Sequence, residues 1–258
     1  MPTRLKSFFA EHPRIAVAFS GGVDSALLAY LARRELGVEN VLLLHASSVL
    51  LPECDRAFTA QFQAAGYRIQ TVELDPLSLD AVRSNRKDRC YHCKKLIFGT
   101  LQAVAAAQGF PVLADGTNAD DPGDYRPGLQ AAAELGVLHP FLACGIGKSD
   151  IRKIAENAAL PNWDLPASAC LASRIPTGTA LEETLLRRIG NAEKSLTELG
   201  FAGVRVRVPG NWVKLEMDPG YFAAVLEKRQ EILSALQQNG FAEVTLDLQG
   251  YRTGSMNR

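Results

Sequence analysis

A glycine-rich string at residues 20–25, Ser-Gly-Gly-Val-Asp-Ser, is the part of the sequence best suited to chemistry. It follows an apolar run and precedes a helical pattern, so it lies where a buried strand ends and a helix begins. Its two glycines let the backbone turn tightly and approach a ligand closely. The N–H groups at the start of the helix attract an anion. The Gly-Lys-Ser/Thr ending of a Walker A loop is absent, so the string predicts an anion-binding loop of another kind.

The carboxylate of Asp24 requires a separate explanation, because a carboxylate repels phosphate. A Mg²⁺ ion that bridges the two would reverse this effect, so we predict that Asp24 holds Mg²⁺ or orients a ligand. The plainer alternative is a Gly-Gly turn whose helix is capped by Asp or Ser. The complete six-residue string, placed after the first expected strand, favours the ligand site.

Three cysteines stand close to basic residues in the sequence. They are Cys90, Cys93 and Cys170, and the basic neighbours are Arg89, Lys94, Lys95 and Arg174. Such neighbours lower the pKa of a thiol and favour the thiolate, which is the nucleophile and the metal ligand. The three could ligate a [4Fe–4S] cluster whose fourth iron stays open. Cys90 and Cys93 could instead ligate zinc, in a site completed by Cys170 or His92, or they could form a redox dithiol that serves Cys170. Cys54 and Cys144 have no such neighbours, and we expect both to be buried as small hydrophobic residues.

Polar residues elsewhere could complete a ligand site. The string at residues 115–121, Asp-Gly-Thr-Asn-Ala-Asp-Asp, follows the fourth expected strand and emerges at the same sheet edge as residues 20–25. Its carboxylates could hold Mg²⁺ or position a substrate, or they could form a polar turn. Arg126 could reach a phosphate. Arg205 and Arg207 alternate on an expected strand, so both point to one face. This favours a two-arginine clamp for phosphate or carboxylate, with a solvated sheet face as the alternative.

Alternating apolar runs and helical patterns must position these residues. Strands are expected at 14–19, 41–46, 67–74, 111–115 and 137–142, and helices at 25–36, 53–65, 91–108, 129–135 and from 148 onward. Strands that alternate with helices are typical of an α/β fold with a doubly wound parallel sheet covered on both faces.

The pattern changes after residue 160. Residues 160–179 are rich in Pro, Ser and Ala and indicate an ordered loop. A helix at 181–199 follows, and then strands at 204–208 and 212–217 flank a Pro-Gly-Asn turn, which signals a hairpin. A helix at 221–238 and a strand at 243–248 end the pattern. We therefore predict two domains, residues 1–180 and a small α+β domain over residues 181–258.

Composition excludes several classes of protein. The 258 residues include 28 Lys and Arg and 28 Asp and Glu, so no overall charge attracts nucleic acid or an anionic membrane. We find neither a signal peptide nor a run of roughly 20 apolar residues, and we expect a cytoplasmic protein. Its five cysteines are then thiols or metal ligands and not a disulfide framework.

The string at residues 20–25 closely resembles the PP-loop of the ATP pyrophosphatase superfamily, which includes NAD and GMP synthetases and tRNA thiolation enzymes. The resemblance implies that ATP is cleaved between its α and β phosphates and that a substrate is adenylated. It places around ATP the residues Ser20, Gly21, Gly22, Val23, Asp24, Ser25 and Gly116.

A longer set of motifs resembles the LarE family, the pyridinium-3,5-biscarboxylic acid mononucleotide sulfurtransferases of nickel-pincer cofactor biosynthesis. The motifs are, in order, SGGVDS, DGTNADD, RPGLQAAAELGVLHP, PASACLASRIPTG, VRVRVPGN and DLQGYRTGSMN. The resemblance implies that ATP adenylates a carboxylate of the mononucleotide and that sulfur then displaces AMP. It also implies a homo-oligomer, a hexamer in this family.

The family includes two versions of the sulfur-transfer step. In one version, a cysteine at the position of Cys170 gives up its own sulfur and becomes dehydroalanine. In the other, three cysteines bind a [4Fe–4S] cluster that carries an extra sulfide, which requires a sulfide or sulfur donor. Because Cys90 and Cys93 accompany Cys170, this chain resembles the cluster type. The substrate contacts that we expect are Arg126, Arg174, Glu193, Arg205 and Arg207.

Other functions of the superfamily are the main alternatives. The zero net charge and the lack of an added RNA-binding domain argue against tRNA thiolation. The lack of a glutaminase domain argues against amide synthesis, although ammonia could serve instead. A nucleotide- or metal-binding regulator without catalysis is the alternative from another class.

Overall fold

The chain alternates between two structural units in the computed structural model, which describes residues 2–52, 54–121, 127–164 and 169–252. Unit 1 comprises Met1–Ser48, Asp55–Pro76 and Asp88–Leu165, and unit 2 comprises Val49–Cys54, Leu77–Lys87 and Pro166–Arg258. The units are defined by contacts within the chain. The expected domains, residues 1–180 and 181–258, concern independent folding and stay a prediction.

Unit 1 is built on a parallel sheet. Its strands are β1 (Ile15–Ala18), β2 (Val41–Ser47), β3 (Ile69–Glu73) and β4 (Leu113–Ala114), in the order β3-β2-β1-β4. Neighbouring strands pair in parallel, with Ile15 opposite Val41 and Ala16 opposite Leu113. Because the order changes direction at β1, the sheet is doubly wound, as the alternating pattern predicted.

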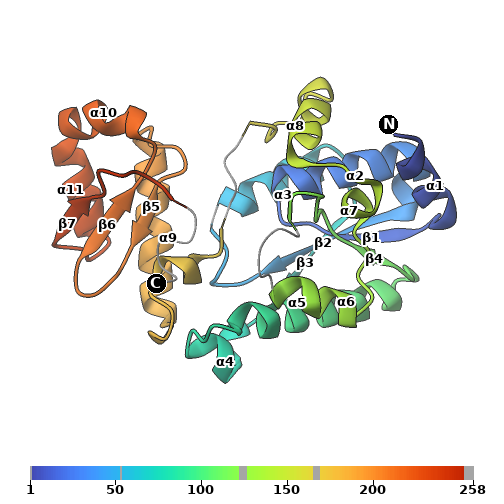
Figure 1. The fold of residues 1–258 in the computed structure, drawn as a ribbon, viewed down its shortest axis with the longest axis horizontal. Helices are drawn as coiled ribbons and strands as arrows, with labels where there is room; N and C mark the ends of the chain where they lie inside the picture. Colours follow the sequence, from blue (N-terminus) through green and yellow to red (C-terminus); the bar gives the residue numbers. More distant parts are fainter. Residues whose placement is uncertain (1, 53, 122–126, 165–168, 253–258) are drawn as a thin grey trace. The chain divides into compact units, whose positions relative to one another are not determined.

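Helices cover both faces of this sheet (Figure 1). One face carries α1 (Thr3–Glu11), α2 (Val23–Leu36), α3 (Cys54–Ala64), α7 (Pro140–Cys144) and α8 (Lys148–Asn157), and the other carries α5 (Arg89–Ala107) and α6 (Pro127–Glu134). Alternate residues of β1 and β2 enter different cores: Val17 and Leu43 pack with α2, whereas Ala16 and Leu42 pack with α5. This burial on both sides explains why the strands read as continuous apolar runs.

Two expectations about secondary structure are wrong, and the helix at the start of the chain was not predicted. The strand expected at 137–142 is reduced to a single bridge between Ala114 and Leu138, and α7 begins at Pro140. Proline suits the first turn of a helix, where its missing N–H is not needed. The helix α1 was not predicted, although Leu5 and Phe9, one turn apart, are both buried. The helix expected at 221–238 is divided at Lys228 into α10 (Phe222–Glu227) and α11 (Arg229–Gln238).

Unit 2 contains a three-stranded sheet of β5 (Arg205–Arg207), β6 (Val213–Glu216) and β7 (Val244–Leu246), in that order. The pair β5 and β6 is antiparallel, which confirms the predicted hairpin, and β7 joins β6 in parallel. The helix α9 (Glu183–Glu198) contributes buried Leu186 and Ile189 to the core of this unit. A 3₁₀ helix, η4 (Leu171–Arg174), precedes α9.

Two early segments belong to unit 2 through backbone and side-chain hydrogen bonds. Leu171 N donates to Leu50 O over 2.8 Å, and Leu181 N donates to Arg83 O over 2.7 Å. The buried Asn85 donates from Nδ2 to Pro176 O over 2.9 Å. The remaining short elements are α4 (Asp80–Arg83), η1 (Val38–Asn40), η2 (Pro76–Ser78) and η5 (Pro219–Tyr221). Within the described part of the chain, none of the helices has the length and apolar character that a membrane crossing requires.

Candidate functional site

The loop at residues 20–25 connects β1 to α2 and is held in shape by its own hydroxyl groups. Ser25 Oγ accepts a hydrogen bond from Ser20 N over 3.2 Å and donates to Gly22 O over 3.0 Å. The two serine hydroxyls lie 3.1 Å apart. Gly21 adopts a φ of 83°, a left-handed conformation that glycine tolerates without strain. The residue types of the string are therefore those that this tight turn requires.

The start of α2 faces this loop with its positive end. The N-cap is Gly22, which brings no side chain to cover the first N–H groups of the 14-residue helix. The aligned peptide dipoles add a partial positive charge there. The arrangement suits a phosphate group, as the sequence predicted.

Asp24, in the first turn of α2, meets two residues from distant parts of the chain. Its Oδ2 contacts Lys148 Nζ, and its Oδ1 accepts a hydrogen bond from Asn118 Nδ2 over 3.3 Å. Lys148 is the first residue of α8, and its backbone N–H donates to Asp120 Oδ2 over 2.6 Å. Three segments of unit 1 thus converge on the carboxylate of Asp24, and Lys148 is a cation at this site that sequence reasoning missed.

Residues 115–121 approach the loop as closely as the backbone allows. A Cβ atom at Gly116 would lie 2.7 Å from Ser25 N and 2.8 Å from the carbonyl carbon of Asp24. The expectation that Gly116 lies beside residues 20–25 is therefore confirmed. Asp120 and Asp121 cap backbone N–H groups, at Lys148 and at Asn118 respectively, so the structure favours the turn-and-cap interpretation for these two carboxylates.

Asp115 anchors the start of this segment. Its Oδ1 lies 2.6 Å from His139 Nδ1 and accepts a hydrogen bond from Thr117 N over 3.0 Å. Burial of the carboxyl favours its neutral form, but the hydrogen bond and the charge of His139 outweigh burial and lower the pKa of Asp115. Asp115 therefore fixes the course of the segment that carries Gly116.

Two buried side chains contact the backbone of this loop and of the residue that precedes it. Asn162 is fully buried, and its Nδ2 donates to Gly21 O over 2.7 Å. His45, on β2, is 2% exposed, and its Nδ1 lies 3.0 Å from Phe19 O. Because a carbonyl oxygen only accepts, this nitrogen carries the proton. Neither residue was predicted, since each reaches the loop only through the tertiary fold.

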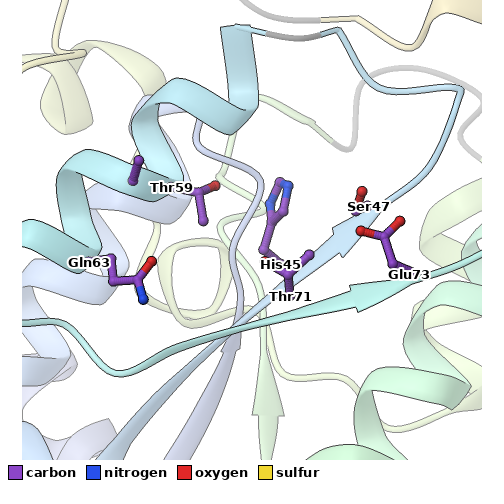
Figure 2. A pocket seen from close by; sticks show the side chains of 7 residues that line it. His45, Ser47, Thr59, Gln63, Thr71 and Glu73 are labelled. Carbon is purple, nitrogen blue, oxygen red and sulfur yellow. The ribbon is translucent and has the colours of Figure 1, made fainter.

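A cavity of about 240 Å³ lies beside His45. Figure 2 shows side chains converging on it from α3 and from the ends of β2 and β3. It is lined by His45, Ser47, Thr59, Ala60, Gln63, Thr71 and Glu73. Hydroxyl, amide and carboxylate groups share this lining with apolar atoms, so the cavity offers both hydrogen-bonding groups and apolar surface.

The cysteine pair lies on the first turn of α5, in unit 1. Cys90 is exposed and Cys93 is half-buried, and their spacing of three residues puts both thiols on one side of the helix. The nearby lysines have other partners: Lys95 Nζ lies 2.6 Å from Glu134 Oε2, and Lys94 Nζ lies over the ring of Phe98. Among the described residues, no three side chains of the His, Cys, Asp and Glu types lie close enough together to hold a metal ion.

The other cysteines differ in environment. Cys144, expected to be buried, is half-buried, and burial raises the pKa of its thiol. The side chain of Cys54 lies outside the described part of the structure.

Cys170, in unit 2, is exposed and directly precedes η4. The fully buried Arg174 holds the backbone around it, because Nη1 donates to Ala169 O over 2.8 Å and to Cys170 O over 3.2 Å. Arg174 also forms a two-pronged ion pair with Glu193 on α9, with both distances at 2.8 Å. The arginine expected near Cys170 therefore fixes the main chain that presents this thiol.

Arg205 and Arg207 lie on the same face of β5, as predicted, but that face is buried. Arg207 pairs with the fully buried Glu216 over 2.8 Å and donates to Ser173 O over 2.6 Å. Burial lowers the pKa of Arg205, and the positive charge of Arg174 lowers it further. The two arginines are thus parts of a packed ionic cluster, and the alternative of a solvated sheet face is wrong.

The predicted residues fall into two groups. Ser20–Ser25, Gly116, Cys90 and Cys93 belong to unit 1, and Cys170, Arg174, Glu193, Arg205 and Arg207 belong to unit 2. Arg126 lies outside the described residues.

Several proteins of known sequence are similar to this chain over most of its length. An uncharacterized protein of Synechocystis is 40% identical over 256 residues, which cover 98% of this chain and 96% of the relative. Pyridinium-3,5-bisthiocarboxylic acid mononucleotide synthase of Lactiplantibacillus plantarum is 37% identical over 246 residues, 95% of this chain and 89% of the synthase. One component of a glutamine-hydrolysing GMP synthase of Methanococcus maripaludis is 25% identical over 232 residues, 85% of this chain and 71% of that component.

No protein-family model matches the chain. The match to the synthase nevertheless covers nearly all of both proteins at 37% identity, and it confirms the resemblance that the motifs indicated. The chain is therefore an enzyme of the LarE family, to which this pyridinium-3,5-bisthiocarboxylic acid mononucleotide synthase belongs.

Proposed function

We propose that this enzyme uses ATP to activate a carboxylate of pyridinium-3,5-biscarboxylic acid mononucleotide and then replaces the activated oxygen with sulfur, in the biosynthesis of the nickel-pincer nucleotide cofactor. The observation that carries the proposal is the 37% identity to a synthase of the bisthiocarboxylic acid mononucleotide over 95% of this chain. The arrangement of the loop at residues 20–25 supports the use of ATP.

The β and γ phosphates of ATP would lie in the loop at residues 20–25. The N–H groups at the start of α2, that of Ser25 among them, and the hydroxyl of Ser20 would donate to their oxygens. Asp24 would hold Mg²⁺ against the phosphates, since its carboxylate already attracts the cationic Lys148. Lys148 would then contact a phosphate oxygen, as a second positive charge at the same place.

The first step forms one bond and breaks one bond. A carboxylate oxygen of the substrate attacks the α phosphorus of ATP, and pyrophosphate leaves with the electron pair of the broken P–O bond. The product is an acyl adenylate, in which AMP is a good leaving group. Positive charge around the pyrophosphate stabilises the charge that develops on it.

The second step replaces AMP with sulfur, and Cys170 is the residue that we assign to it. In the single-turnover route, Cys170 Sγ attacks the acyl carbon and releases AMP. A base then removes the Cα proton of Cys170, the Cβ–Sγ bond breaks, and the thiocarboxylate leaves a dehydroalanine behind. The contacts of Arg174 with Ala169 O and Cys170 O hold the backbone on which this chemistry depends.

In the catalytic route, Cys90, Cys93 and Cys170 would hold a [4Fe–4S] cluster. The spacing of Cys90 and Cys93 on one side of α5 fits two ligands of such a cluster. When bound, the cluster supplies an exchangeable sulfide, so the three thiols keep their own sulfur. This route requires a sulfide or another sulfur donor as a further substrate.

The ionic cluster of unit 2 would bind the phosphate of the mononucleotide. Its named members are the cations Arg174, Arg205, Arg207, Lys214 and Arg252 and the carboxylates Glu193, Glu216 and Asp247. In this set the cations outnumber the carboxylates by two, and a bound anion would offset part of the excess positive charge. Burial is the main cause of the lowered pKa of Arg205, and the nearby charge of Arg174 lowers it further, so a bound anion would favour the charged guanidinium. Arg126 remains a further proposed phosphate contact.

The homo-oligomer, a hexamer, remains a part of the proposal that rests on family resemblance, and the cytoplasmic location remains a proposal that rests on the sequence. Size-exclusion chromatography with light scattering tests the oligomer directly.

The proposal is tested on anaerobically purified enzyme with ATP, Mg²⁺ and the biscarboxylic acid mononucleotide. We expect pyrophosphate and AMP to form with the thiocarboxylate, and Cys170→Ala to abolish the thiocarboxylate while pyrophosphate release continues. Cys144→Ala, which changes a half-buried thiol on α7, serves as the control. Thiocarboxylate formation by Cys170→Ala at the wild-type rate would contradict the role of Cys170.

Iron and acid-labile sulfide content separates the two routes. About four irons per chain, lost in Cys90→Ala, supports the cluster. Active enzyme without iron, with a loss of mass at Cys170 equal to hydrogen sulfide, supports the single-turnover route.

A further inference from the structure

The buried side chain of Asn162 makes one hydrogen bond whose acceptor lies inside the loop at residues 20–25. Its Nδ2 donates to Gly21 O over 2.7 Å, and the side chain has no exposed surface. Asn162 belongs to the segment that follows α8, and this segment is tied back to the helix by Leu160 N, which donates to Ala155 O over 3.0 Å. The segment that carries Asn162 is therefore held against the end of α8.

The direction of one peptide group depends on this hydrogen bond. Gly21 O and the N–H of Gly22 belong to the same trans peptide, so they point in opposite directions. With Gly21 O held toward the interior, Gly22 N–H points toward the opening of the loop. There it lies 3.4 Å from Ser20 Oγ, a long contact at an exposed position. Gly22 N–H is therefore well placed to donate to an anion.

The same peptide could also adopt the reverse orientation. A flip changes ψ of Gly21 and φ of Gly22, and glycine tolerates the resulting positive φ. The flipped peptide would present Gly21 O, a partial negative charge, to the anion and would turn the N–H of Gly22 inward. In the buried interior, that N–H would face Nδ2 of Asn162, a second donor, and only a rotation of the side-chain amide would bring the acceptor Oδ1 to it.

We propose that Asn162 is a positioning residue that locks the Gly21–Gly22 peptide with its N–H toward the pyrophosphate of ATP. The proposal deepens the proposed function and rests on ATP binding at residues 20–25. Without the amide of Asn162, part of the molecules would hold the flipped peptide, and apparent affinity would fall in proportion to the competent fraction. A competent fraction of about one tenth would raise the dissociation constants of ATP and pyrophosphate about tenfold.

The test measures ATP and pyrophosphate binding by titration calorimetry, with no mononucleotide and no sulfur donor present. We expect Asn162→Ala to bind both ligands about tenfold more weakly than wild type at every pH. Asn40→Ala is the matched control, because Asn40 Nδ2 also donates to a backbone carbonyl, Leu36 O, over 2.9 Å, at the other end of α2. We expect this control to bind as wild type does.

Asn162→Asp provides a readout that a purely structural role would not produce. The protonated carboxyl can donate to Gly21 O, and the carboxylate cannot. Relative to wild type at the same pH, ATP affinity of this variant should be nearly normal at low pH and should fall as pH rises through the pKa of the new carboxyl. The ATP affinity of Asn162→Ala relative to that of wild type should not change with pH. If Asn162→Ala does not fold, the pH dependence of ATP affinity in Asn162→Asp tests the inference by itself.

Two results with the variants would overturn the inference. One is a folded Asn162→Ala that binds pyrophosphate as tightly as wild type does. The other is an Asn162→Asp variant whose affinity relative to wild type does not change with pH. Wild-type binding of ATP without any thiocarboxylate formation would refute the proposed function and leave this inference intact. A wild-type protein that binds neither ATP nor pyrophosphate would refute both.

Discussion

Replacement of Gly116 by alanine adds one methyl group at the point where residues 115–121 meet the start of α2. The new Cβ would lie 2.7 Å from Ser25 N, 2.8 Å from the carbonyl carbon of Asp24 and 2.9 Å from its Cβ. Carbon atoms do not approach this closely, and two of the three neighbours are backbone atoms that cannot rotate away. Either the first turn of α2 or the segment that carries Gly116 must therefore move.

The loss in stability of Gly116→Ala can be estimated from this geometry. Extra methyl groups in a well-packed interior destabilise a protein by about 1–3 kcal/mol. For a chain of this size, each kcal/mol lowers the melting temperature by roughly 2–4 °C, so Gly116→Ala should melt roughly 2–12 °C below wild type. The shift also moves the N–H groups that we assign to the phosphates, and a misplacement of about 1 Å can slow a reaction roughly 100-fold.

Gly99→Ala is the matched control for this experiment. Gly99 lies inside α5, and a Cβ there would meet nothing within 4 Å. Alanine is the better helix former by about 1 kcal/mol, so Gly99→Ala should melt at or above the wild-type temperature and release pyrophosphate normally. Differential scanning calorimetry and a pyrophosphate release assay measure both effects. A Gly116→Ala variant that matches wild type in melting temperature and in pyrophosphate release would refute the reasoning.

Three further predictions concern ionic contacts. Lys148→Met should weaken ATP binding at least about tenfold, since it removes a charged donor, and calorimetry that shows wild-type affinity would remove Lys148 from the phosphate site. Glu216→Gln should destabilise the protein by about 3–5 kcal/mol, because Arg207 stays buried beside a neutral partner; a melting temperature within about 2 °C of wild type would contradict this. The lowered pKa of Asp115, held by His139, implies stability that is present above the unfolded pKa and lost as pH falls through the folded pKa. Asp115→Asn should therefore be less stable than wild type at neutral pH, and acid titrations should show the difference vanish as pH falls below the folded-state pKa of Asp115.

The parts of the fold that could be predicted depend on local pattern. Strands β1 and β2 are buried on both faces, so their sequences are almost uninterrupted apolar runs. Once parallel strands are assigned, their carboxyl ends must share one edge, and the proximity of Gly116 to residues 20–25 follows from that rule alone. The strand expected at 137–142 is wrong because apolar composition was given more weight than Pro140, which begins a helix.

The contacts that hold the site could not be predicted in the same way. Lys148 is 124 residues from Asp24, and Asn162 is 141 residues from Gly21. No local periodicity records such pairs, because they depend on how α8 packs against α2. The burial of Arg207 could not be predicted either. The alternation of residues along β5 shows which face Arg207 lies on, but it does not show that this face is buried against Glu216.

The discontinuous make-up of unit 2 has a consequence for the order in which the protein forms during synthesis. Residues 49–54 and 77–87 leave the ribosome well before their partners, since Leu50 O is bonded by Leu171 and Arg83 O by Leu181. At about 5–20 residues per second, residues near Leu50 wait on the order of ten seconds for Leu171. During this interval Leu50 and Val82, which are 3% and 1% exposed in the finished protein, have no completed core to enter. These two segments are therefore where a chaperone would bind the unfinished chain, and where a truncated product would begin to aggregate.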